Sequence, residues 1–191
     1  MPDPISYTLR FTAPQAHYVE VEAVVPTGGR PEVELMMATW TPGSYMIREF
    51  ARHVEALSAT AESGEPLAVV KTRKNRWAVT TRGTPRAVVR YRVYGREMSV
   101  RTNFIDAGFA ILNGAPTFLT LAEDGKRPHD VRVVLPPGWK TAIAALPAAP
   151  GEAAGEGETV RFRAEDFDAL VDAPIYAGNP AIYPFEVGGR P

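Results

Sequence analysis

Histidine is the residue type of this chain best suited to binding a catalytic metal ion, and the spacing of the three histidines argues against a shared site. His17, His53 and His129 lie far apart in the sequence. None belongs to an H-E-x-x-H motif, which would place two imidazoles one helical turn apart beside a glutamate base. The chain has no cysteine, which excludes thiolate ligands and cysteine nucleophiles. We expect no metal site and no cofactor in this chain, and we interpret each histidine as an edge or surface strand residue.

Serine and phosphate chemistry also lack their usual motifs. The nearest match to the nucleophile motif G-x-S-x-G is Pro42-Gly43-Ser44-Tyr45, which lacks the second glycine. Proline followed by glycine is typical of a tight turn, so we expect a turn with Ser44 bonded to local backbone. No glycine-rich phosphate loop of the G-x-x-x-x-G-K-[ST] or G-x-G-x-x-G type occurs.

A basic run at residues 71–76, followed by Trp77, has the composition of a nucleic-acid contact. The whole chain, however, has 21 Lys and Arg against 22 Asp and Glu, a formal net charge of -1. This balance gives no global attraction to nucleic acid or to an anionic membrane. We therefore expect a basic turn that enters an aromatic strand, and neither a nucleic-acid nor a membrane partner.

The most unusual segment is residues 101–121, where large apolar side chains crowd around Gly108 and the pair Asn113-Gly114. Asn-Gly is strongly favoured in two-residue hairpin turns, so the segment predicts a buried hairpin that turns at this pair. A contact with a ligand is the alternative that composition leaves open.

Hydrophobic residues alternate with polar ones along most of the chain, which is the period of strands that bury one face. Residues 5–11 and 19–25 predict an antiparallel hairpin, and similar segments raise the count to at least seven strands. The 18 prolines and 16 glycines fall largely between these segments and argue against long helices. We predict an all-β, mostly antiparallel fold, either a β-sandwich or saddle-like curved sheets, with at most one or two short helices. Residues 46–57 fit both periods, and their structure stays open.

The length of 191 residues with 45% hydrophobic residues is sufficient for one domain with a sizeable core. The acidic, Gly- and Pro-rich residues 147–158 predict a flexible excursion between two strands. The N-terminus has no signal-peptide pattern, and no apolar run approaches the ~20 residues of a membrane helix. We expect a cytoplasmic protein, although export of a full-length protein stays open.

Three blocks of the sequence, in order, carry a resemblance to a known family. They are WTPGSYMIREFARH at residues 40–53, GFAILNGAPTFL at residues 108–119 and FDALVDAPIYAG at residues 167–178. Together they resemble the N-terminal domain of the glycyl aminopeptidase family of zinc metallopeptidases, the PDZ-containing aminopeptidases of the gluzincin clan.

The resemblance implies one part of a modular hydrolase. Residues 1–175 would form its N-terminal β domain, and residues 176–191 would begin a linker to a catalytic domain that holds zinc on an H-E-x-x-H helix. None of the family's catalytic residues matches a position in this chain, so whether the chain is an enzyme stays open. The expected partners are its own catalytic domain and, through the whole enzyme, a peptide substrate.

The resemblance also implies contact residues. In related aminopeptidases a loop of the N-terminal domain faces the cleft and helps to hold the substrate amine. The positions that match this substrate-cleft contact are Gly108, Phe109, Asn113 and Gly114. The first block would pack against the catalytic domain through Tyr45, Arg48 and Glu49, although Arg48 and Glu49 fit a solvated local pair equally well.

Two other functions stay under consideration. A stand-alone β-sandwich would bind a protein or carbohydrate through exposed aromatic residues such as Tyr18, Tyr45, Trp77 and Tyr94. A chain that is itself an enzyme would need a cleft that joins one histidine to carboxylates such as Asp106 or Asp130.

Overall fold

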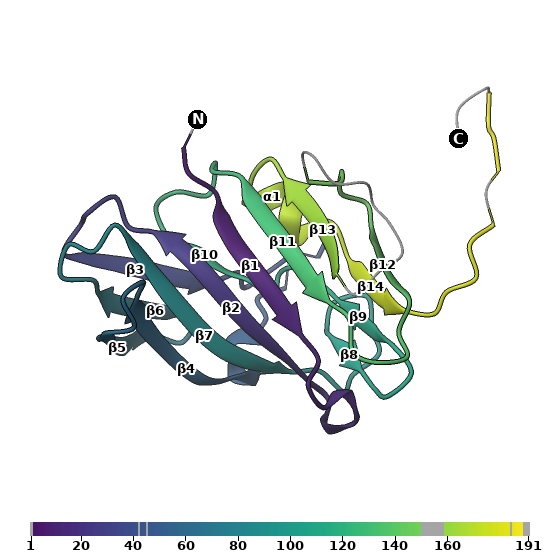
Figure 1. The fold of residues 1–191 in the computed structure, drawn as a ribbon, viewed down its shortest axis with the longest axis horizontal. Helices are drawn as coiled ribbons and strands as arrows, with labels where there is room; N and C mark the ends of the chain where they lie inside the picture. Colours follow the sequence, from purple (N-terminus) through teal and green to yellow (C-terminus); the bar gives the residue numbers. More distant parts are fainter. Residues whose placement is uncertain (1, 42, 45, 150–158, 184, 189–191) are drawn as a thin grey trace.

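The computed structural model of the chain describes residues 2–41, 43–44, 46–149, 159–183 and 185–188. Its strands form a sheet of ten strands and a sheet of four (Figure 1). Within these ranges the single α-helix is α1 (Phe167–Val171), and two short 3-10 helices are η1 (Pro14–Ala16) and η2 (Phe50–His53). The predicted all-β fold of curved sheets with short helices is confirmed.

The large sheet is antiparallel except at one pair of neighbouring strands, the first and the eleventh of the chain. In spatial order its strands are β10 (Leu119–Leu121), β3 (Glu32–Met37), β6 (Arg76–Thr80), β5 (Pro66–Arg73), β4 (Val54–Ala61), β7 (Arg86–Tyr94), β2 (Tyr18–Pro26), β1 (Ile5–Arg10), β11 (His129–Val134) and β13 (Thr159–Ala164). The parallel pair is β1 with β11. The small sheet has the order β12 (Thr141–Ala144), β14 (Ile175–Gly178), β9 (Ala110–Leu112) and β8 (Phe104–Ile105).

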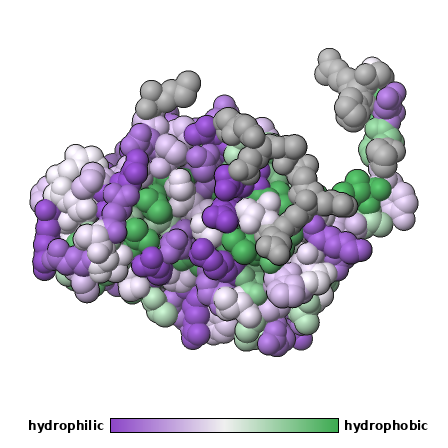
Figure 2. All heavy atoms as spheres, in the orientation of Figure 1, coloured by the Kyte–Doolittle hydropathy of each residue, from purple (hydrophilic) through white to green (hydrophobic). Residues whose placement is uncertain are grey.

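The alternating pattern of the sequence has the expected cause, because each long strand buries one face. In β1, Ile5, Tyr7 and Leu9 are buried while the residues between them reach solvent. Figure 2 shows hydrophilic residues across much of the outer face on which β1, β2 and β7 lie, with smaller apolar areas between them. Full burial of a leucine-sized side chain stabilises a fold by about 1.5–3 kcal/mol. The antiparallel pairing of β1 with β2 confirms the predicted hairpin.

Residues 46–57, which fit two periods, contain both kinds of structure. The 3-10 helix η2 buries Phe50 and Ala51, and strand β4 follows at Val54. β4 then bulges between Glu55 and Ser58. The mixed pattern in the sequence therefore reflects a short helical turn that leads directly into a bulged strand.

The prediction of a hairpin turn at Asn113-Gly114 is wrong. Strand β9 before this pair joins β8 and β14 of the small sheet, whereas β10 after it pairs with β3 of the large sheet. The chain thus crosses between sheets here. The physical reason is burial. A two-residue hairpin turn would expose Asn113 and Gly114 to solvent, whereas here both residues are buried against other segments of the chain.

Strand β14 lies between β12 and β9, so the small sheet continues to Gly178, beyond the expected boundary after residue 175. A linker in the following residues stays a prediction. Of the expected excursion at residues 147–158, positions 150–158 lie outside the described residues. No helix in the described part of the chain has the length and apolar character needed to cross a membrane.

Candidate functional site

The first sequence block forms the predicted turn. The backbone N–H of Ser44 donates to the carbonyl of Thr41 at 3.0 Å, and Gly43 has a φ of 75°, in the left-handed region that favours glycine. Pro42 and Tyr45 lie outside the described residues, so the contact expected of Tyr45 stays a prediction. Ser44 is therefore a turn residue, as its sequence context indicates.

Residues 47–53 meet a second segment, residues 96–103, on one surface. Both segments line a hollow of about 250 Å³. A neighbouring hollow of about 190 Å³ shares His53 and Thr102 with it and extends to Pro116 in the second sequence block. The fold thus brings together two blocks that are far apart in the sequence. We call residues 46–53 and 96–102 the loop face.

The loop face exposes four large apolar side chains. Met46 is 64% exposed and Ile47 is 74% exposed, and from the second segment Met98 is 61% and Val100 is 81% exposed. Single exposed apolar residues are common on protein surfaces and need no explanation. Four of them on two segments that line the same hollow are a concentration of exposed apolar residues, which is a feature of contact surfaces.

Arg48 and Glu49 do not pair with each other. Glu49 forms an exposed ion pair with Lys74, and the hydrogen bond from Lys74 lowers the pKa of this carboxyl. Arg48 has no carboxylate partner among the described residues, and its Nε atom is buried without a hydrogen-bond partner there. Its backbone N–H donates to the carbonyl of Thr39 at 2.6 Å, which holds the main chain in place.

A buried polar network fixes the chain after β9. The backbone N–H of Asn113 donates to Asn103 Oδ1 at 2.8 Å, and the Asn113 side-chain amide donates to the Thr102 carbonyl at 2.5 Å. The Asn103 amide donates to Thr117 Oγ1 at 2.8 Å. The Thr117 hydroxyl in turn donates to the Asn113 carbonyl at 2.7 Å, and Tyr91 OH donates to the Thr117 carbonyl at 3.0 Å. A satisfied network of this kind holds the second block rigidly against the loop face.

The four residues expected at a substrate cleft lie at the two ends of strand β9. Gly108 and Phe109 precede it in the β8–β9 connection, where Gly108 is exposed and has open space around its Cα. Phe109 is half-buried and stacks on Tyr176, with ring centroids 5.7 Å apart. Asn113 and Gly114 follow β9 and are buried.

Gly114 makes a close contact that requires glycine. A Cβ atom at this position would lie 2.4 Å from the carbonyl oxygen of Leu170 and 2.6 Å from the Cα of Val171, both in helix α1. These residues belong to the third sequence block. Asn113 and Gly114 therefore position the second block within the domain, and Gly108 and Phe109 are the accessible pair.

Comparison with known families identifies the domain. The family described as Peptidase M61 N-terminal domain matches residues 6–179. The chain belongs to the M61 peptidase N-terminal domain family. Comparison with curated proteins gave no match.

A solved structure supports the same assignment for this M61 domain. The crystal structure of an aminopeptidase N family protein from Idiomarina loihiensis superimposes with a TM-score of 0.86 at 29% identity, over 97% of this chain. The match covers 31% of that solved chain, so the domain spans about a third of it. The resemblance to the N-terminal domain of zinc aminopeptidases is confirmed, and a stand-alone binding module is not favoured.

The described residues of the M61 domain do not fit a zinc ion, because no three His, Asp or Glu side chains among them lie together. The interpretation of His129 as an edge or surface residue is wrong. It is fully buried in β11, between β1 and β13, and its Nε2 lies 3.1 Å from Thr120 Oγ1. Burial lowers its pKa to about 4. His129 is therefore a neutral core residue and no metal ligand.

The other two histidines of the M61 domain lie nearer the surface. His17 follows η1 with a φ of 66°, and its Nδ1 lies 2.6 Å from the Ile105 carbonyl oxygen. His53 lines both hollows of the loop face with Glu97, but no hydrogen bond joins the two side chains, and Arg52 Nε donates to His53 Nε2 at 3.0 Å. Burial lowers the pKa of His53. This pair of groups lacks the orienting contacts of an acid–base site.

The carboxylates and aromatic residues expected of the other two functions have structural partners. Asp106 pairs with Arg96, and Asp130 pairs with Arg163, at nitrogen-to-oxygen distances of 3.1 and 3.0 Å. Trp77 is buried, at 5% exposure, so it is no part of an exposed aromatic patch.

Sequence reasoning missed the second segment of the loop face. Met98 and Val100 are the two large apolar residues of a polar stretch, REMSVRT at residues 96–102, where they alternate with polar residues over too few positions to predict a strand. The signal that could have found them is the presence of two large apolar residues in an otherwise polar stretch. Exposed apolar residues that lie close together mark a contact surface.

Proposed function

We propose that this chain is the non-catalytic N-terminal domain of a zinc-dependent aminopeptidase of the glycyl aminopeptidase type, which packs on the catalytic domain and shapes the site for the substrate N-terminus. The observation that carries the proposal is the loop face, where the first and second family blocks converge beside exposed apolar residues. Membership of the M61 N-terminal domain family supports the same role.

The loop face has the features of a surface that packs against another domain. Met46, Ile47, Met98 and Val100 offer the apolar part of an interface. Arg48 offers a polar anchor, because its half-buried guanidinium forms no ion pair among the described residues and would bind a carboxylate of a partner domain. We assign the interdomain contact to these residues together with Tyr45, and we assign Glu49 to the rim, where its partner is Lys74.

The substrate contact is assigned by accessibility. At the β8–β9 connection Gly108 is exposed and Phe109 is half-buried, and the missing side chain of Gly108 permits a close approach of peptide backbone. Asn113 and Gly114 serve this contact by holding β9 in place. Arg96 connects the regions, since it lines a hollow of the loop face and pairs with Asp106 next to the connection.

Zinc, supplied by the catalytic domain, would polarise the scissile carbonyl and activate water there. The residues of this chain would exclude water from the cleft and restrict it to free N-termini. A cytoplasmic location and the absence of a nucleic-acid partner stay predictions.

The test is hydrolysis of glycyl and alanyl p-nitroanilide by the 191-residue chain and by the chain extended through the gene sequence that follows it. We expect zinc-dependent turnover by the extended protein alone. Zinc-dependent turnover by the 191-residue chain that survives repurification would contradict the proposal.

A further inference from the structure

Strands β4 and β5 pair along only a small part of their length. The ladder has two paired positions, both next to the turn that joins the strands. β4 then bulges, with Ala56 at a φ of 52°, in the left-handed region that alanine rarely adopts. Residues 68–73 of β5 pair with β6 on one side and with no strand on the other among the described residues. This part of β5 therefore has one unpaired edge, although β5 lies between β6 and β4 in the sheet.

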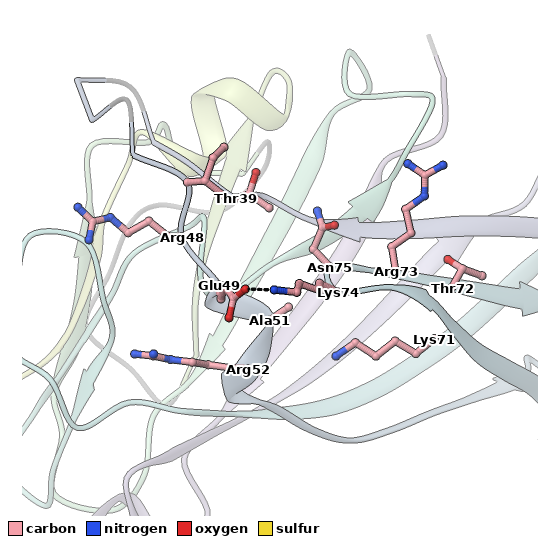
Figure 3. A pocket seen from close by; sticks show the side chains of 11 residues that line it. Thr39, Arg48, Glu49, Ala51, Arg52, Lys71, Thr72, Arg73, Lys74 and Asn75 are labelled. Carbon is pink, nitrogen blue, oxygen red and sulfur yellow. Dashed lines mark hydrogen bonds and ion pairs between the residues drawn. The ribbon is translucent and has the colours of Figure 1, made fainter.

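A concavity of about 670 Å³ lies where the two strands diverge (Figure 3). One wall is formed by η2 and the residues before it, and the other by the end of β5 and the β5–β6 turn. Figure 3 shows Lys74 reaching across from the second wall to Glu49 on the first. The charged lining residues are one carboxylate, Glu49, and five cations, Arg48, Arg52, Lys71, Arg73 and Lys74.

Most of this positive charge is in no direct ion pair, although Arg52 and Arg73 lie near enough to Glu49 and Glu34 to lower the pKa of these carboxyls. Among these five cations, only Lys74 forms an ion pair with a carboxylate in the described structure, and that carboxylate is Glu49. Lys71 lies over the ring of Trp77 instead, 5.1 Å from its centroid. A ligand that enters the concavity therefore meets four cations without a carboxylate partner among the described residues, beside a strand edge with free hydrogen-bonding groups.

We propose that the concavity binds an extended acidic segment of a second protein, which adds as a strand to the open edge of β5. The backbone N–H and C=O groups of residues 68–73 would pair with the segment, and acidic side chains would face the cations. The edge spans roughly 20 Å at about 3.3 Å per residue, which fits a segment of about six residues. This inference goes beyond the proposed function, since it rests on the edge of β5 and on the cations of the β5 end, although Ile47 and Arg48 line the concavity and also belong to the loop face.

A peptide is favoured over other anions because of the strand edge. A nucleic acid offers phosphates to the cations but has no regular N–H and C=O row to match β5. Lysine and arginine on an open edge also repel the same edge of another copy, which protects the chain against pairing with itself. The same charges attract an acidic strand.

The experiment measures binding of a fluorescent, acetylated Glu-Val-Glu-Val-Glu-Val peptide to the 191-residue chain by anisotropy. We expect saturable binding that weakens with added salt, and no binding of the Lys-Val counterpart. The double change Lys71→Glu and Arg73→Glu should weaken binding by about tenfold or more, whereas Arg10→Glu, an exposed arginine on β1, should leave it unchanged. Arg52→Glu alters the opposite wall and gives an independent check.

N-methylation of the peptide separates strand addition from simple charge attraction. In a paired strand alternate N–H groups face the partner, so methylating one alternate set should abolish binding and methylating the other should leave it within about twofold. Equal binding of both methylated peptides would overturn the proposal. Tighter binding of a single-stranded oligonucleotide than of the acidic peptide would also overturn it.

Discussion

Mild acid should destabilise this domain through His129. The residue is fully buried, and burial lowers its pKa from 6.5 to about 4, so the folded chain keeps it neutral where the unfolded chain binds a proton. The stability that the neutral residue contributes is complete above the unfolded value of 6.5 and is lost as the pH falls toward the folded value of about 4. From these two values, the free energy of unfolding falls by about 2 kcal/mol between pH 7.5 and pH 5.0 on account of His129 alone.

The assay is urea unfolding followed by tryptophan fluorescence at both pH values, for the wild type and for His129→Gln. Glutamine does not titrate, so the variant should lose about 2 kcal/mol less than the wild type between the two pH values, although it is less stable at pH 7.5. His53→Gln is the control and should change the pH dependence less, because His53 is only partly buried. An equal loss of stability in His129→Gln and wild type would refute the reasoning.

Three further predictions concern packing, the polar network and the loop face. Gly114→Ala should lower the free energy of unfolding by about 1–3 kcal/mol, because the added Cβ would collide with the backbone of α1. The control Gly108→Ala should lower it by less than about 0.5 kcal/mol, and equal effects of the two changes in thermal denaturation would contradict this. Asn103→Ala should cost about 1–3 kcal/mol in urea unfolding, since two buried hydrogen bonds are lost, and a neutral result would show that the network is not satisfied as described. The double change Ile47→Ser and Val100→Ser should alter the free energy of unfolding by less than about 0.5 kcal/mol, because both side chains are exposed. Calorimetric titration should show about tenfold weaker association with the catalytic domain, and unchanged affinity would exclude the loop face as the contact.

The strands were predictable because their signal is local. A strand with one buried face must alternate, and β1 and β7 do so over their whole length and β2 as far as Val25. The same alternation predicts that His129 is buried, because it lies on the same side of β11 as the buried Val131 and Val133. The prediction for this histidine failed because the polar character of the residue was given more weight than its position in the pattern.

The connections were less predictable because their causes lie far away in the sequence. Asn113-Gly114 has the composition of a hairpin turn, but Asn113 bonds to Asn103 and Gly114 packs against α1. Nothing in the pair itself identifies those partners. The convergence of residues 47–53 with residues 96–103 has the same origin, since it depends on which strands lie next to each other in the sheet.

The most direct test of the proposed role is calorimetric titration of the 191-residue chain into the separately purified polypeptide encoded after it, with glycyl p-nitroanilide hydrolysis followed in the same mixtures. We predict stoichiometric binding, a gain in zinc-dependent hydrolysis on mixing, and loss of both when Ile47 and Val100 are replaced by serine. Failure to bind, or full aminopeptidase activity of the second polypeptide without this domain, would contradict the account.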